Sequence, residues 1–152
     1  MVDDLPTDEA EALLNLIKFG DTTSGWEWAE EIAGVATCAF GVTDSDGRRI
    51  QGVTAELFVK YGSRPPSTHF RFTIFKKEYR VRRRVYQLDI LQNGRKRRDA
   101  HGLPHEHVGQ ERRPGDSQWI DFRYCDALQL FCTRTNLCLA PELPDPFELV
   151  LS

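Results

Sequence analysis

Two neighbouring segments with alternating polar and apolar side chains constrain the fold of this chain most. In residues 68–77, Phe70, Phe72 and Ile74 alternate with polar side chains. Side chains along a β-strand point alternately to the two faces of a sheet, so this pattern predicts a half-buried strand. Residues 80–91 also alternate, and their period places five side chains on one face: Arg82, Arg84, Tyr86, Leu88 and Ile90.

Turn-forming residues separate the other predicted strands. Residues 44–47, with the sequence Asp-Ser-Asp-Gly, lie between the apolar segments 35–42 and 50–60 and predict a β-hairpin. Asn93-Gly94 is the strongest two-residue turn in the sequence. It predicts a second hairpin, which joins the preceding strand to residues 95–100.

Helices are predicted near both ends of the chain. Residues 8–19 carry apolar side chains at helical spacing, acidic residues in the first turn and Gly20 directly after the end. Residues 121–134 also have apolar side chains at helical spacing and predict a second helix. Residues 101–115 carry no such pattern and are expected to form a loop.

These elements predict one α+β domain over residues 1–152. The expected architecture is an antiparallel sheet of four to six strands, with an N-terminal helix and a C-terminal helix packed on it. Within this domain we distinguish an acidic helical segment at residues 1–34, the sheet and helix core at residues 35–135, and a proline-rich tail at residues 136–152. The length is that of one typical domain, and the content of 40% hydrophobic and 28% charged residues fits neither a disordered chain nor a membrane protein.

Basic residues are concentrated in one part of the sequence. The whole chain has 20 Lys and Arg residues and 23 Asp and Glu residues, which gives a net charge of −3. Residues 71–98 nevertheless hold 11 of the basic residues and only two acidic ones, while the segments on either side are acidic. This concentration favours contact with a polyanion. The alternative is a solvated sheet face that packs against the protein's own acidic helices.

Three of the four histidines lie close together, directly after the basic residues 95–98. His101, His105 and His107 follow Asp99 on the predicted loop. Imidazole titrates near neutral pH, so one ring can accept a proton from a nucleophile while another ring donates one to a leaving group. The first interpretation is therefore acid–base catalysis on a phosphodiester, with these four residues as the candidate catalytic groups.

Neighbouring cations would hold the phosphate and offset the charge that develops during the reaction. The candidates for binding phosphate or nucleic acid are Arg82, Arg84, Tyr86, Arg95, Lys96, Arg97 and Arg98. Positive surroundings should lower the pKa values of the histidines, because they penalise the imidazolium form. A histidine that acts as the acid would therefore need a carboxylate nearby, such as that of Asp99 or Glu106.

Two other interpretations of the histidine cluster stay open. In a strand, His105 and His107 would point the same way and could present two nitrogens to one metal ion, with His101 or Asp99 completing the site. The surrounding positive charge disfavours a bare divalent cation, so we predict neither a metal nor another cofactor. In the remaining interpretation, the rings only cap loops and form hydrogen bonds with the backbone.

Several other features are interpreted structurally or used to exclude functions. His69 shares a strand face with Arg71 and is equally consistent with a surface position, while Cys125 and Cys132 are expected in the core. The sequence has no P-loop and no motif of dinucleotide-binding proteins, α/β-hydrolases or zincins. It also has no apolar run that could span a membrane, and it begins with acidic residues rather than a secretory signal. We therefore expect a cytoplasmic protein without membrane contact.

Part of the sequence resembles a known family. Residues 86–90, the following hairpin, Asp99-Ala100-His101 and Pro104-His105-Glu106-His107-Val108 are similar to the TumE-like bacterial toxins and related small uncharacterised families. Those proteins carry a similar strand, an Asp and a His, and a Pro-His-x-x-His or Pro-His-x-His element before a final helix. The similarity covers about residues 68–135, a little under half of the chain.

The resemblance implies an RNA-cleaving toxin of a toxin–antitoxin pair, which a partner protein holds inactive. It would place the Asp and the three clustered histidines in the active site, with Arg82 and Arg84 beside the phosphate. The histidine cluster and the concentration of basic residues lead to two functional hypotheses. The first is a metal-independent endoribonuclease that uses histidine acid–base chemistry. The second is a non-catalytic module that binds nucleic acid, a nucleotide or a protein, for example a phage-type inhibitor of a defence system.

Overall fold

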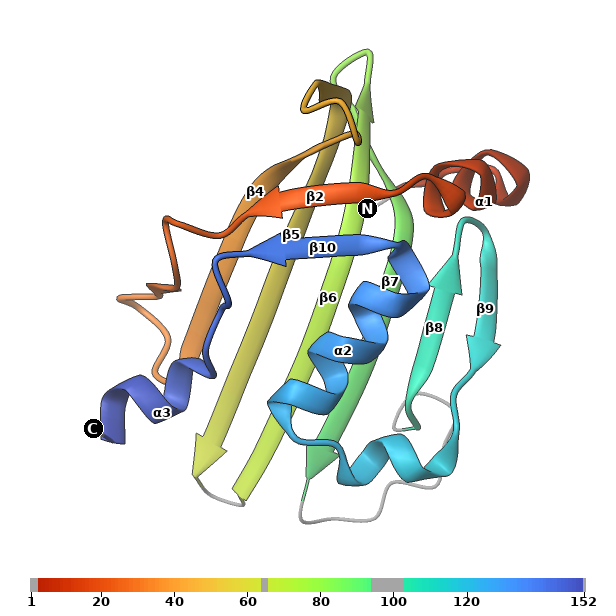
Figure 1. Ribbon diagram of the computed structural model, residues 1–152. Helices are drawn as coiled ribbons and strands as arrows, with labels where there is room; N and C mark the ends of the chain where they lie inside the picture. The colour runs from red at the N-terminus through yellow and green to blue at the C-terminus, as the bar shows by residue number, and fades with distance from the viewer. Residues whose placement is uncertain (1–2, 64–65, 94–102, 152) are drawn as a thin grey trace.

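Four long antiparallel strands form the centre of the fold (Figure 1). The computed structural model describes residues 3–63, 66–93 and 103–151. The strands are β4 (Val35–Thr43), β5 (Arg49–Ser63), β6 (Pro66–Glu78) and β7 (Val81–Asn93). The hairpin predicted for residues 35–60 and the two predicted alternating strands are confirmed.

Six shorter strands extend this centre into a ten-stranded mixed sheet. They are β1 (Asp3–Asp4), β2 (Lys18–Asp21), β3 (Glu27–Trp28), β8 (His105–Val108), β9 (Glu111–Pro114) and β10 (Leu137–Ala140). The main order is β10-β2-β4-β5-β6-β7-β8-β9, while β1 pairs with β7 and β3 pairs with β4. The β1–β7 and β10–β2 pairings are parallel. The expected antiparallel sheet of four to six strands with two flanking helices is therefore wrong.

The missed strands are too short to show an alternating pattern in the sequence. β8 and β9 lie in the segment that was expected to be a loop, where they form a hairpin of two four-residue strands. Gly109 turns this hairpin with a φ of 54°, and a Cβ atom there would lie 2.6 Å from the Cα of Thr7. Only glycine fits this turn without displacing the backbone at the start of the first helix.

The helices are short and lie near both ends of the described chain. They are α1 (Thr7–Asn15), α2 (Tyr124–Thr135) and α3 (Pro146–Leu151), with a 3₁₀ turn at Ser117–Asp121. The predicted helix over residues 8–19 ends early because Leu16 is extended and Lys18 begins β2. The buried amine of Lys18 donates hydrogen bonds to the carbonyls of Leu16 and Thr135, at 2.6 and 2.7 Å. None of the helices in the described residues is long and apolar enough to cross a membrane.

One face of the sheet builds the hydrophobic core together with α1 and α2. Figure 1 shows α2 lying in front of the long strands. Phe131 of α2 is fully buried against Phe72 and Tyr86, with ring centroids 5.7 and 5.9 Å away. Cys132 is half-buried beside this core, whereas Cys125 is exposed, so the prediction of a core position for Cys125 is wrong. The polar residues that alternate with the core residues face the other side of the sheet.

A β-bulge changes the faces that the sequence pattern predicts for β7. The register shifts between Ile74 and Phe75, so that Ile74 pairs with Tyr86 and Phe75 pairs with Arg84. Val85 is the extra residue of β7 at this point. Tyr86 therefore faces the core, while Arg84 lies on the opposite face, and the prediction that these two side chains share a face is wrong.

Candidate functional site

The sheet face opposite α2 gathers polar side chains from four adjacent strands, and we call this surface the histidine face. It consists of His69, Arg71 and Thr73 of β6, Gln87 and Asp89 of β7, His105 and His107 of β8, and Arg112 of β9. The register aligns them in two rows across the strands. One row runs from Arg71 through Asp89 to His105, and the other runs from Thr73 through Gln87 and His107 to Arg112.

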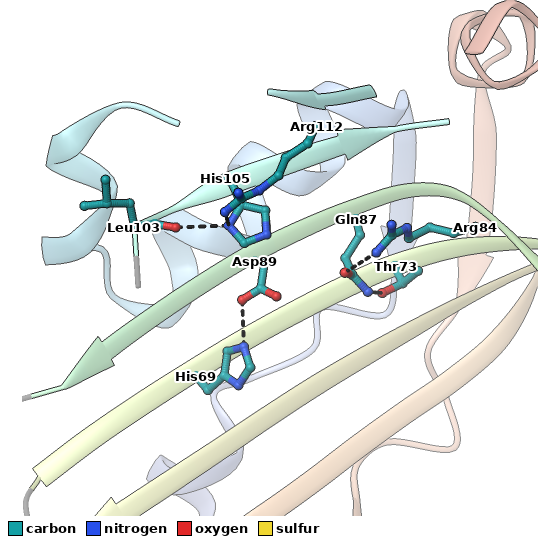
Figure 2. Close-up of polar contacts among 8 residues, drawn as sticks. All are labelled: His69, Thr73, Arg84, Gln87, Asp89, Leu103, His105 and Arg112. Carbon is teal, nitrogen blue, oxygen red and sulfur yellow. Dashed lines mark hydrogen bonds and ion pairs between the residues drawn. The ribbon is translucent and has the colours of Figure 1, made fainter. Parts of the chain in front are cut away.

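Asp89 lies between two histidines at the centre of this surface (Figure 2). Nε2 of His69 is 2.7 Å from Oδ1 of Asp89, and both side chains are 22% exposed. Burial alone would raise the pKa of Asp89, but the hydrogen bond and charge of His69, together with His105 and Arg71, lower it. Because an ionised carboxylate only accepts hydrogen bonds, Nε2 of His69 carries its proton and Nδ1 is the remaining ring nitrogen.

His105 forms its hydrogen bond through Nδ1, whereas His69 uses Nε2. Its Nδ1 lies 3.0 Å from the carbonyl oxygen of Leu103, which can only accept, so Nδ1 carries a proton and Nε2 is left for a ligand. Nη2 of Arg112, which can only donate, is 3.4 Å from the same Nδ1, and the shorter contact with the Leu103 carbonyl decides which nitrogen carries the proton (Figure 2). His105 is also the cross-strand neighbour of Asp89. The two histidines beside Asp89 therefore leave different ring nitrogens available.

The surroundings of His107 hold its ring in the neutral form. Burial lowers its pKa to about 4, and the nearby charges of Arg84 and His105 act in the same direction. The ring lies edge-on to that of His105, with 4.9 Å between the centroids. At neutral pH, His107 is therefore uncharged and can donate one hydrogen bond and accept another.

Two of the predicted phosphate-binding arginines lie at one end of this face, where the protein's own carboxylates already contact them. Nε of Arg84 donates to Asp4 at 2.8 Å, and its Nη1 donates to Gln87 at 3.0 Å. Gln87 in turn donates to Thr73 at 2.9 Å (Figure 2). Arg82 contacts Glu56 at 3.3 Å. These pairs show that part of the basic segment is compensated within the molecule.

Tyr86 and Glu106 do not lie on the histidine face. The Tyr86 hydroxyl donates to the carboxylate of Glu106 at 2.5 Å, on the core side of the sheet. Nε of Arg134 donates to the same carboxylate oxygen at 2.8 Å and connects α2 to this pair. Burial raises the pKa of Tyr86 well above its ordinary value, and the charge of Glu106 adds to this effect. The two residues therefore stabilise the core, away from the face that was expected to use them.

The remaining candidates from the sequence lie outside the described residues. They are the catalytic candidates Asp99 and His101 and the phosphate-binding candidates Arg95, Lys96, Arg97 and Arg98. The predicted hairpin at Asn93-Gly94 also extends into this segment. Of the proposed histidine cluster, the structure thus describes His105 and His107, and it brings their rings together.

His69 and Asp89 form the pair that sequence reasoning missed. The alternation had already placed His69 and Arg71 on one strand face and Asp89 on one face of the next strand. The missing information was the register, since Arg71 pairs with Asp89 and brings His69 within reach of it. Without the turn type between the two strands, the sequence did not fix this register.

The described residues contain no group of three or more histidine, cysteine, aspartate or glutamate side chains arranged to hold a metal ion. No protein-family model matches the chain, and no curated protein or solved structure matches it. The site therefore has to be interpreted from its own geometry.

Proposed function

We propose that this protein is a metal-independent endoribonuclease whose active site is the histidine face. The observation that carries the proposal is the arrangement of His69 and His105 on either side of Asp89. Two imidazoles that each leave one ring nitrogen available can serve as a paired general acid and general base. Arg71 and Arg112 flank this group and supply positive charge for a phosphate.

The reaction needs only groups of the protein and of RNA. Nε2 of His105 removes the proton of the ribose 2′-hydroxyl, and the 2′-oxygen attacks phosphorus. As the O2′–P bond forms, the P–O5′ bond breaks, and the 5′-oxygen takes a proton from Nδ1 of protonated His69. The Asp89 carboxylate stabilises the positive charge on His69 before that transfer. The products are a 2′,3′-cyclic phosphate and a 5′-hydroxyl.

Arginine side chains stabilise the charge that builds up on the phosphate oxygens. Arg71 lies above the ring of Phe58, with its guanidinium carbon 4.3 Å from the centroid, which holds it beside His69. His107 stays neutral at neutral pH and can form hydrogen bonds with the substrate without adding charge. The resemblance to TumE-like toxins supports RNA cleavage and shares His105 with this site, and it adds a cellular role, an RNA-cleaving toxin held inactive by a partner protein.

The proposal is tested by incubating the purified protein with a labelled RNA and with its DNA counterpart in excess EDTA. We expect the RNA to be cut, with 2′,3′-cyclic phosphate ends, because the 2′-hydroxyl is the nucleophile. The DNA should stay intact, since it lacks that group. Intact RNA would contradict the proposal, and binding without cleavage would favour the non-catalytic module. Equal cutting of RNA and DNA would also contradict it.

A further inference from the structure

We propose that the histidine face continues into a track for single-stranded RNA, which ends at the turn between β6 and β7. In this arrangement, Tyr79 stacks on a base several nucleotides from the bond that is cut. The inference rests on the proposed function and adds the class and minimum length of its substrate. It is carried by the backbone of the turn, the exposure of its side chains and the residues between the turn and His69.

The β6–β7 turn holds two ordinary side chains in a strained backbone conformation. Tyr79 has a φ of 50° and Arg80 a φ of 69°, and Glu78 pairs with Val81 across the turn. A two-residue hairpin turn with positive φ at both positions favours Asn-Gly, because a larger side chain crowds the backbone there. Strain of this kind is typical of positions where the side chains themselves have a function.

The side chains of this turn are suited to a single nucleic-acid strand. Tyr79 is 98% exposed, so its ring is open to solvent. Lys77 and Arg80 are exposed beside it, and neither forms an ion pair with any residue of the described part of the chain. Bases of any sequence stack on an aromatic ring, while nearby cations attract the phosphates.

Arginines lie between the turn and His69: Arg82 and Arg84, which also form ion pairs with Glu56 and Asp4, and Arg71. The guanidinium carbon of Arg82 lies 3.8 Å from the ring centroid of Phe75, and that of Arg71 lies 4.3 Å from the centroid of Phe58. Arg84 lies between them along β7. At about 3.3 Å per residue, the strand from His69 to Tyr79 spans roughly 30 Å, a distance that requires a strand of several nucleotides.

The track is tested with a variant that keeps the turn but removes the tyrosine ring and the arginine side chain. The double substitution Tyr79→Asn and Arg80→Gly creates the favoured Asn-Gly turn at the same length, so its melting temperature should equal or exceed that of the unchanged protein. Binding is measured by fluorescence anisotropy with uncleavable 2′-O-methyl oligouridines of about four and about twelve nucleotides. Tyr79→Phe, which keeps the ring, is the matched control.

We expect the double variant to bind the long oligonucleotide at least about fivefold more weakly, because about fivefold is the lower limit for the loss of one stacked base. Its affinity for the short oligonucleotide should equal that of the unchanged protein. Tyr79→Phe should bind both like the unchanged protein. Unchanged binding of the long oligonucleotide to the double variant, or equal weakening for both lengths, would overturn the track. If the unchanged protein cuts RNA, the proposed function is still supported when either of these two results overturns the track. If the unchanged protein neither binds nor cuts RNA, both proposals fail.

Discussion

At the scale of single residues, the contacts of each ring decide which nitrogen of each histidine can take part in chemistry. The carboxylate of Asp89 accepts a hydrogen bond from Nε2 of His69, and the carbonyl of Leu103 accepts one from Nδ1 of His105. His107 is uncharged at neutral pH because burial lowers its pKa to about 4. In the proposed mechanism, His69 is therefore the general acid, His105 the general base and His107 a neutral hydrogen-bonding group.

The pKa of His107 predicts how acid affects stability. Since the folded pKa is about 4 and the ordinary value is 6.5, the unfolded chain binds more protons between these values. His107 therefore destabilises the folded protein as the pH falls from 6.5 towards 4, and makes its full contribution above 6.5. The variant His107→Gln should not lose this part of its free energy of unfolding at low pH, because glutamine does not titrate. Urea unfolding at about pH 7.5 and about pH 4.5 gives the free energy of unfolding of both proteins at each pH. The same pH dependence in both proteins would contradict a lowered pKa for His107.

At the scale of elements, β8 serves two parts of the molecule. His105 and His107 lie on the histidine face, whereas Glu106 between them lies on the core face. The Glu106 carboxylate accepts hydrogen bonds from Tyr86 of β7 and Arg134 of α2. The same short strand therefore positions two rings of the histidine face and connects α2 to the sheet.

Substitution of Glu106 should separate these two roles. Glu106→Ala leaves the buried Tyr86 hydroxyl without its acceptor, which should lower the free energy of unfolding by about 1–3 kcal/mol. RNA cleavage measured well below the melting temperature should stay close to that of the unchanged protein, because Glu106 lies on the core side of β8, away from the histidine face. Urea titration and initial rates provide the two measurements. A large loss of rate in a folded variant would place Glu106 in the active site instead.

The same elements explain how far the sequence could predict this structure. β6 and β7 are long enough for alternation to reveal them, whereas β8 and β9 have four residues each and look like loop sequence. The bulge beside Phe75 reverses the face of Arg84 and leaves no trace in the alternation. The pairing of His69 with Asp89 depends on a turn of Tyr79 and Arg80, which does not resemble the usual hairpin turns.

At the scale of the whole molecule, the protein's own carboxylates compensate part of the basic segment, and contact with a polyanion stays a prediction. Asp4 forms an ion pair with Arg84, and Glu56 forms one with Arg82, so some of the charge of this segment is compensated internally. The proposed RNA track contains other cations, namely Arg71 on the histidine face and Lys77 and Arg80 at the exposed turn.

The most direct test of the account is the rate of RNA cleavage in EDTA by His69→Gln, His105→Gln and the double variant. Each single variant should lose about 100-fold or more, as expected for removal of a general acid or base. The double variant should be little worse than either single one, because the two rings act as a unit. Glu106→Gln, on the opposite face of β8, is the folded control and should keep its rate. Single variants within a few fold of the unchanged protein would contradict the assignment of His69 and His105 as the catalytic pair.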